Sequence, residues 1–387
     1  MSNKCRVCGK KLYKEPLLQY YNMPNRAQFF VEESELNEDK GIDLFLYQCS
    51  GCGLLQLNVE PVSYYKDVIR AAGVSDEMKS YRLKHFSDFV NRYNLKNKKV
   101  IEIGTGSGEF LELMNKTDAK AYGLEHLDES VNTCLEKKLD VYKGFIEDEN
   151  YEIENAPYDA FFIMNFLEHI PNPNEFLQGI TNNLKDNAIG LIEVPNVDMI
   201  LEKAMFSEFI SDHLMYFTKD TLKFLLEKNG FEVVEIQEVW HDYVISMIVK
   251  KRNKLVLNEF NKQLSFISNQ INLFIDKNIE KGFKVAVWGA GHQSLAVMAM
   301  TNIAPKIQFV IDSAPFKQGK YTPATHAKVV SPSILKEVKI GAILVMAASY
   351  SDEVARIINR DYPEIIIAIL RDDKLEMKNS TKCDFLE

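Results

Sequence analysis

No apolar run in this chain of 387 residues reaches membrane-spanning length, and its N-terminus has no signal-peptide core. Positive charge is not in excess either, because the formal net charge at pH 7 is −9. That charge balance argues against a general nucleic-acid binder and against a protein held on an anionic membrane. The sequence therefore predicts a cytoplasmic protein with neither a membrane partner nor a nucleic-acid partner.

Cysteine is also scarce, with six residues, and a disulfide framework is not expected in a cytoplasmic protein. Four of the six cysteines form two Cys-x-x-Cys-Gly motifs, made by Cys5 with Cys8 and by Cys49 with Cys52. Two close pairs of thiolates suit a closed, tetrahedral zinc site, and the following glycines permit the tight turns. A redox role is the alternative, but no βαβ pattern surrounds either pair. We predict structural zinc.

A strongly apolar stretch runs into a glycine-rich turn at residues 100–108, and a helical pattern follows at once. Gly104, Gly106 and Gly108 allow a sharp turn and a close approach to a bound molecule. Glu125, at the end of the next apolar run, suits hydrogen bonds from two ribose hydroxyls. Such a turn fits either NAD or S-adenosylmethionine (SAM).

Glu102, just before the first glycine, favours SAM. A carboxylate there would repel the pyrophosphate of a dinucleotide but would attract the ammonium group of a methionine. In this respect the segment resembles the first motif of class I SAM-dependent methyltransferases. The residues that we expect to contact SAM are Glu102, Gly104, Thr105, Gly106, Gly108, Glu125, Phe145, Ile146 and Asn165.

Strand and helix patterns alternate over residues 98–251 and end in a hairpin, which predicts a parallel sheet with one antiparallel strand, covered by helices. An amphipathic helix follows, and the alternation restarts over residues 283–371. The expected fold class is α/β, with a Rossmann-like class I methyltransferase core at residues 61–252. That core lies between a zinc-binding module at residues 1–60 and a smaller Rossmann-like α/β domain at residues 253–387.

The last domain contains a second glycine turn, Gly289-Ala-Gly291, with His292 opening the next helix. A helix N-terminus of this kind can receive an anionic group. The turn could serve a substrate diphosphate or a second cofactor. A bound NAD would require Asp312, at the tip of the following strand, to meet its ribose.

Two histidines are candidates for proton chemistry. His169 follows the strand pattern of residues 160–164, which places it at the carboxyl edge of the sheet, where ligands bind. His213 follows Asp212 directly, and an aspartate beside a histidine can orient the ring. A neutral imidazole is the commonest proton acceptor at neutral pH. A purely structural role is the alternative for each histidine.

In their order along the chain, the two cysteine pairs, the glycine turn, Leu167-Glu-His-Ile, Asp212-His-x-x-Tyr-Phe and Trp288-Gly-Ala-Gly-His resemble the sugar C-methyltransferase family. Its members methylate a carbon of a nucleotide-linked keto-deoxysugar. The resemblance implies zinc at the four cysteines, an acid–histidine pair at Asp212 and His213, and an active-site histidine at His169. The stretch from Asp312 to Pro323 is similar to the family's Asp-x-x-Pro-x-Lys-Gln-Gly. The expected substrate-binding residues are Gly289, Gly291, His292 and Lys317.

Three departures from the family concern the acceptor. Tyrosines usual in the family are missing from Ile69–Ala72 and from Ile210-Ser211, and residues 241–243 lack the usual glycine pair. We expect His213 to remove a proton beside a ketone, with His169 positioning a sugar held between the middle and last domains. Methylation of a hydroxyl, an RNA methyltransferase and a non-catalytic scaffold are the alternatives. The sequence does not reveal the sugar, the nucleotide or whether the chain is a monomer or a dimer.

Overall fold

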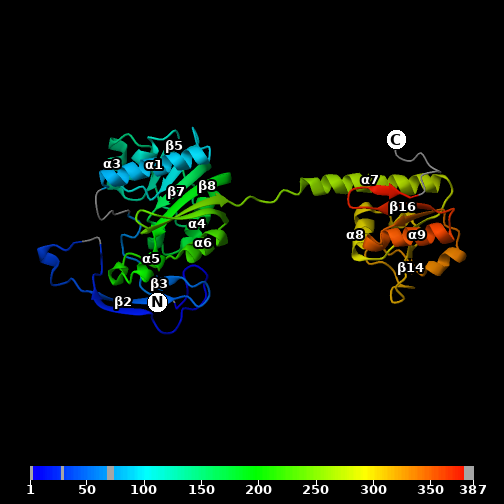
Figure 1. Cartoon of the computed structure of the whole chain (residues 1–387), viewed down its shortest axis with the longest axis horizontal. Coiled ribbons are helices and arrows are strands. Elements are labelled where there is room, and N and C mark those ends of the chain that lie inside the picture. The colour runs from blue at the N-terminus through cyan, green and yellow to red at the C-terminus, as the bar shows by residue number, and fades with distance from the viewer. Residues whose placement is uncertain (1–2, 28–29, 68–73, 379–387) are drawn as a thin grey trace. The chain divides into compact units, whose positions relative to one another are not determined.

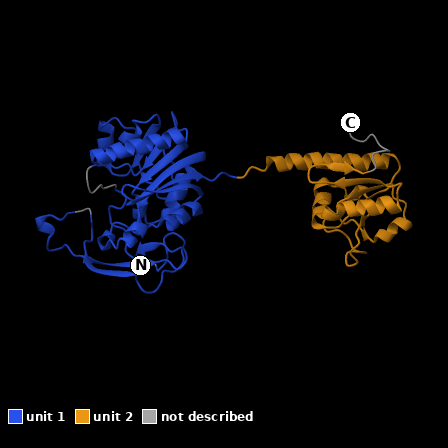
Figure 2. Ribbon diagram, viewed as in Figure 1, with its two compact units in different colours: residues 1–254 blue, residues 255–387 orange. Residues whose placement is uncertain are grey.

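A computed structural model describes residues 3–27, 30–67 and 74–378, which leaves Ile69–Ala72 outside the described part. The chain divides into two compact units, Met1–Lys254 and Leu255–Glu387 (Figure 2). Within the described residues, no helix combines the length and the apolar character needed to cross a membrane.

The first unit is built on a seven-stranded sheet. All of its strands run parallel except β11, which is antiparallel to both of its neighbours. This is the arrangement predicted for residues 98–251, including the reversed strand of the terminal hairpin. In spatial order the strands are β10 (Phe231–Val239), β11 (Val244–Lys251), β8 (Leu184–Pro195), β7 (Tyr158–Met164), β4 (Lys99–Ile103), β5 (Lys120–Glu125) and β6 (Val141–Lys143).

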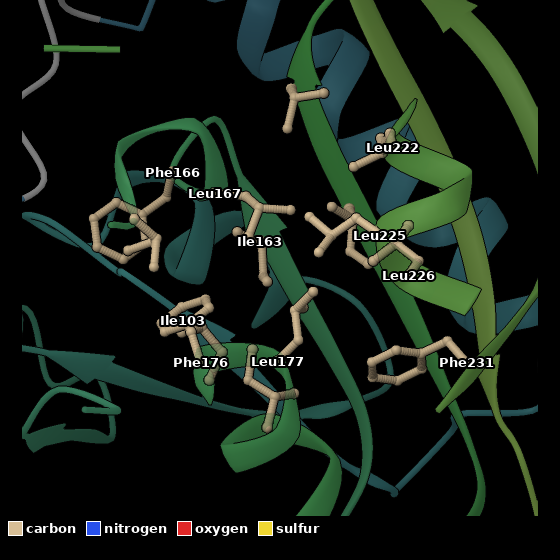
Figure 3. Close-up of a cluster of buried hydrophobic side chains, with 14 of the residues drawn as sticks. Ile103, Ile163, Phe166, Leu167, Phe176, Leu177, Leu222, Leu225, Leu226 and Phe231 are labelled. Carbon is tan, nitrogen blue, oxygen red and sulfur yellow. The ribbon is translucent and has the colours of Figure 1, made fainter. Parts of the chain in front are cut away.

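Helices cover both faces of this sheet (Figure 1). One face packs against α1 (Asp76–Arg92), α2 (Glu109–Met114) and α3 (Asp128–Glu136). The other packs against α4 (Pro173–Asn182) and α6 (Lys219–Lys228). Both of these last helices place apolar residues at spacings of three and four, so that one side of each enters the core. Figure 3 shows this core, with the side chains of α4 and α6 against those of β4 and β7.

A smaller sheet in the first unit joins the two ends of its sequence. Its strand order is β1 (Leu18–Met23), β2 (Ile42–Gln48), β3 (Leu55–Leu57) and β9 (Met215–Tyr216). The N–H of Leu57 also donates to the carbonyl of Leu214 (3.1 Å). The residues after His213 therefore complete the sheet of the cysteine-containing segment. The remaining helical elements of the first unit, within the described residues, are η1 (Glu33–Glu35), η2 (Leu167–His169), α5 (Val197–Glu202) and η3 (Phe206–Glu208).

The second unit is a six-stranded sheet in which only β17 runs antiparallel to its neighbour. Its order is β14 (Val329–Val330), β13 (Val310–Ile311), β12 (Val285–Trp288), β15 (Ala342–Val345), β16 (Ile366–Leu370) and β17 (Leu375–Met377). Helices α7 (Asn258–Glu280) and α8 (His292–Thr301) share one apolar cluster, and α9 (Ser351–Asp361) belongs to the other. The short helices are η4 (Ala304–Lys306), η5 (Pro332–Lys336) and η6 (Ala348–Tyr350).

Candidate active site

The first glycine turn connects β4 to α2 at the carboxyl edge of the seven-stranded sheet. Gly104 has a φ of +76°, and a Cβ there would lie 2.6 Å from Cδ1 of Phe166. Gly108 caps α2 with a φ of +86°, and a Cβ there would lie 2.6 Å from Leu139. Only glycine satisfies both the left-handed backbone and the close packing at these two positions. Thr105 is fully buried between them.

Glu125, at the end of β5, holds the turn from the side. Its carboxylate accepts hydrogen bonds from the N–H groups of Gly106 (2.6 Å), His126 (2.9 Å) and Leu127 (2.9 Å). Burial raises the pKa of Glu125, although these hydrogen bonds oppose the shift. Glu102, within β4, is also fully buried. Two buried acidic side chains therefore flank the turn, and the binding of a cation there stays a prediction.

Aromatic rings cover the rest of the predicted cofactor site. Lys66, Gly104, Phe145 and Phe166 are among the residues that line a cavity of about 10 Å³. Lys66 Nζ lies 5.0 Å from the centre of the Phe145 ring. A cavity of this size is at the lower limit of the roughly 10–15 Å³ that accommodates a single water molecule, so an adenine could enter only after these side chains move. Ile146 is buried, with its side chain against Gly179.

Asn165 follows β7 in a left-handed conformation with a φ of +48°. Its N–H donates to the carbonyl of Glu193 (2.9 Å). Its Oδ1 is buried and has no hydrogen-bond partner among the described residues. A buried acceptor of this kind calls for a donor that the chain itself does not supply.

His169 and His213 meet although they are far apart in the sequence. Their ring centres are 4.7 Å apart at 84°, in an edge-to-face arrangement. Phe166, which lies on Gly104, is 6.4 Å from the His169 ring. Burial, together with the nearby His169, holds the pKa of His213 well below its ordinary value. Both histidines predicted for proton chemistry are therefore close together, and His213 is neutral at neutral pH.

The carboxylate of Asp212 does not point at the His213 ring, which the sequence suggested it would orient. The carboxylate accepts hydrogen bonds from Tyr64 Oη (3.2 and 3.0 Å), the N–H of Ala27 (3.0 Å) and Ser211 Oγ (3.3 Å). Its main-chain carbonyl lies 2.9 Å from Nδ1 of His169. No hydrogen bond within the described ranges joins the Asp212 carboxylate to the His213 ring. Asp212 therefore fixes the main chain beside His213 and, through its carbonyl, the ring of His169.

Two residues at this site were not predicted. Tyr64 lies 148 positions before Asp212, and nothing in the local sequence marks it. Glu168 lies in the motif that identified His169, but sequence reasoning gave it no role. One ligand atom from each of Glu168, His169 and His213 lies within 4.8 Å of the others. Burial raises the pKa of Glu168 to about 8.

The four cysteines come together as predicted. Cys5 Sγ is 3.6 Å from Cys52 Sγ, and Cys8 Sγ is 3.3 Å from Cys49 Sγ. Main-chain N–H groups point at two of the sulfurs, from Val7 and Cys8 to Cys5 (both 3.4 Å) and from Gly51 and Cys52 to Cys49 (3.2 and 3.4 Å). Burial opposes ionisation of Cys49, but its hydrogen bonds lower its pKa to about 7. Four converging thiols of this kind fit tetrahedral zinc.

The second glycine turn borders a pocket of about 420 Å³ in the second unit. The pocket lining includes Gly289, Gly291, His292, Asp312 and Lys317, so the four predicted substrate-binding residues share one site. Asp312 accepts hydrogen bonds from the N–H groups of Ala290 (2.8 Å) and Ala314 (2.9 Å) and from Lys317 Nζ (2.9 Å). Burial alone would raise the pKa of Asp312, but these contacts outweigh it and the pKa is lowered.

Comparisons with known proteins find two family models that match separate parts of the chain. A family model described as a methyltransferase domain matches residues 77–236, and one described as a C-methyltransferase C-terminal domain matches residues 249–363. C-methyltransferase NovU of Streptomyces niveus is 22% identical over 386 residues, which cover 91% of each chain.

Other relatives match only the middle of the chain. A ubiquinone biosynthesis O-methyltransferase of Rickettsia typhi is 20% identical over 220 residues, which cover 52% of this chain and 88% of that protein. A solved SAM-dependent methyltransferase from Aquifex aeolicus is 19% identical, with a TM-score of 0.36 over 45% of this chain and 98% of that one.

Proposed function

We propose that this chain, a SAM-dependent methyltransferase of the C-methyltransferase family, methylates a carbon beside a keto group of a nucleotide-linked sugar, with His213 as the base. The near full-length match to a C-methyltransferase and the C-terminal family model support transfer to carbon. The motifs that resemble the sugar C-methyltransferases support the sugar.

The observation that carries this proposal is the continuity from the glycine turn to the base. Phe166 packs on Gly104, His169 follows Phe166, and the His213 ring lies 4.7 Å from that of His169. A neutral ring at this place can take a proton from a carbon beside a ketone, which leaves an enolate. The enolate carbon would be the nucleophile for the methyl group that SAM supplies when it is bound, and residues that hold the acceptor in line would lower the barrier. The contact between His169 Nδ1 and the Asp212 carbonyl orients the His169 ring, and we assign His169 to positioning the sugar.

The described residues fit SAM, which supplies an electrophilic methyl group when it is bound. The acidic lining of the turn by Glu102 and Glu125 suits its cationic end, and the unpartnered Oδ1 of Asn165 suits a donor on the ligand. We assign Gly104, Thr105, Gly106 and Gly108 to the turn around it, and Phe145 and Ile146 to its adenine. We assign zinc to Cys5, Cys8, Cys49 and Cys52, and one zinc per chain by elemental analysis would support that assignment.

We assign the substrate's diphosphate to the pocket of the second unit. Gly291 is the N-cap of α8, no side chain of the described residues caps the helix there, and Gly291, His292 and Lys317 line the same pocket. At this position the diphosphate would face the N-terminus of α8, which is the positive end of the helix dipole. NAD fits this pocket poorly, because the carboxylate that would bind its ribose, Asp312, is already bonded to two N–H groups and to Lys317.

A second candidate is methylation of a hydroxyl. The O-methyltransferases that match the middle of the chain favour it, and His213 would then take a proton from oxygen. Their match does not extend over the whole chain, whereas that of the C-methyltransferase does, so we place it second.

One experiment separates the two candidates. The protein is incubated with SAM carrying a ¹³C-methyl group and with dTDP-, GDP- and UDP-linked sugars, each with and without a 4-keto group. We expect label on carbon, detected by NMR, with a keto sugar only. Label on oxygen would favour the second candidate, and no transfer to any sugar would contradict the proposed acceptor.

The base is tested separately with His213→Ala. We expect turnover to fall roughly hundred- to ten-thousandfold, as for a lost general base, with SAM affinity unchanged by calorimetry. Near-normal turnover in a variant that still binds SAM would reject the role of His213.

A further inference from the structure

We propose that Glu168 is the carboxylate partner of His213. It would complete, with His169 and His213, the group that transfers the proton, and it would have the role that the sequence predicted for Asp212. The role of this pair in removing a proton from the acceptor rests on the proposed function. The pairing of Glu168 with His213 rests on the geometry of Glu168, His169 and His213.

The first argument is that a carboxyl group is buried without a partner. Glu168 is 1% exposed, and neither carboxyl oxygen has a hydrogen-bond partner among the described residues. Burying an unpaired carboxyl costs free energy, so an unsatisfied group of this kind requires an explanation other than stability. Only its main chain has a structural task, because its carbonyl accepts the N–H of Leu214 (3.0 Å).

The second argument is where that carboxyl lies. One of its oxygens is within 4.8 Å of a ring nitrogen of both His169 and His213. Asp212 is the neighbour of His213 in sequence, but its carboxylate is held by Tyr64, Ser211 and Ala27. Hydrogen bonds in an active site are often long before the substrate binds and shorten in the complex. Glu168 is therefore the carboxyl placed to pair with the His213 ring.

The third argument is the chemistry of such a pair. A carboxylate that accepts one ring N–H of a histidine leaves the lone pair on its other ring nitrogen, which is the tautomer that a base needs. When that nitrogen takes the proton from the acceptor, the C–H electron pair passes into the enolate. The imidazolium then hands its other proton to Glu168, so that both His213 and Glu168 end neutral. Within the buried site no separated charge remains on the pair, and the proton leaves later from Glu168 to water.

The ionisable groups around Glu168 are neutral at neutral pH. The ionisable groups that face it are His169 on η2, His213 before β9, Tyr216 on β9 and Tyr243 before β11. Because burial raises its pKa to about 8, the carboxylate form increases as the pH rises through that value. Turnover should therefore rise with pH over the same range.

The test uses the full chain without substrate first. The ring Cε1–H resonances of His169 and His213, assigned with His169→Ala and His213→Ala, are followed from about pH 6 to about pH 10. We expect an inflection near pH 8 in the wild type, its loss in Glu168→Gln, and its retention in Glu175→Gln, the same change at an exposed glutamate of α4. Identical titrations in wild type and Glu168→Gln would overturn the proposal. So would an inflection that EDTA abolishes, because it would belong to a bound cation.

Turnover with SAM and dTDP-4-keto-6-deoxyglucose gives the second readout. We expect Glu168→Gln to lose about tenfold or more of the turnover and the rise near pH 8, with SAM affinity unchanged. A rise in turnover that persists in Glu168→Gln would overturn the role of Glu168. Failure of the proposed function looks different, because His213→Ala would then keep its turnover or the sugar would accept no methyl group. The substrate-free titration still decides the Glu168 assignment in that case.

Discussion

The two glycine turns of this chain share one sequence pattern and differ in what surrounds them. Each follows an apolar strand, each opens a helix, and each is held by a carboxylate at the end of the next strand, Glu125 or Asp312. Among the described residues, Glu125 accepts hydrogen bonds only from main-chain N–H groups, and burial raises its pKa. Asp312 also accepts Lys317, and its contacts lower its pKa.

The space beside the two turns differs as well. The cavity at the first turn is about 10 Å³ and is lined by aromatic rings and by Lys66, which is paired with Glu147, whereas the pocket at the second is about 420 Å³ and is lined by Lys317, which is bonded to Asp312. The comparison teaches that the glycine pattern specifies a close approach of the backbone to a ligand. The charge of the side chains nearby specifies which ligand. This difference supports our proposal of a cation at the first turn and an anion at the second.

Alanine at the two turns should give the largest difference. A Cβ at Gly104 would meet Phe166 at 2.6 Å with a φ of +76°, whereas a Cβ at Gly291 would meet nothing within 4 Å. The left-handed backbone alone costs an alanine about 1–2 kcal/mol. We expect Gly104→Ala to weaken SAM binding about tenfold or more in calorimetry, and Gly291→Ala to leave it unchanged. Equal weakening by both variants would break the comparison.

Removing the positive charge of Lys317 at the second turn should have an intermediate effect on the kinetics. We expect Lys317→Gln to raise the KM for the nucleotide-linked acceptor about tenfold while SAM affinity and kcat change little, as for a lost phosphate contact. The exposed Lys320, three residues further on, provides the control Lys320→Gln, which should keep the wild-type KM. If the control raises the KM as much, the effect is one of general charge and not of the pocket.

The smallest effect should be opposite pH dependences of stability. The lowered pKa of Asp312 means that its contribution is present above its unfolded value of 3.8 and is lost as the pH falls through its folded pKa. The raised pKa of Glu125 means that folding opposes its ionisation as the pH rises above 4.5. Above about pH 4, Asp312→Asn should be about 1 kcal/mol less stable than the wild type, and this difference should shrink as the pH falls below 3.8. Glu125→Gln should gain stability relative to the wild type as the pH rises above 4.5. Urea unfolding at several pH values measures both slopes, and slopes of the same sign would contradict the assignment.

Much of the fold and the enzyme class could be predicted from local patterns. The strands before both glycine turns, the reversed strand of the sheet and the SAM-dependent methyltransferase class are confirmed. These features rest on short runs of sequence whose period and glycine positions are visible directly. The family resemblance is confirmed by a relative that covers 91% of the chain.

Contacts between loops that are far apart in the sequence could not be predicted. Tyr64 reaches Asp212 across 148 positions, and no periodicity predicts that a tyrosine would bond that carboxylate. Adjacency in sequence suggested that Asp212 orients His213, but the main chain at that point directs the carboxylate elsewhere. The carboxyl that faces His213 is contributed by a neighbouring turn. Such arrangements depend on how loops cross at the edge of a sheet, which no local pattern encodes.

The pairing of β9 with β3 connects the cysteine-containing segment to the backbone beside the proposed catalytic base, His213. Gln56 on β3 pairs with Met215, two residues after His213, and its amide oxygen accepts the N–H of Arg6 between the first two cysteines (3.0 Å). A shift of the cysteine loops would therefore pull on the backbone that presents the histidine.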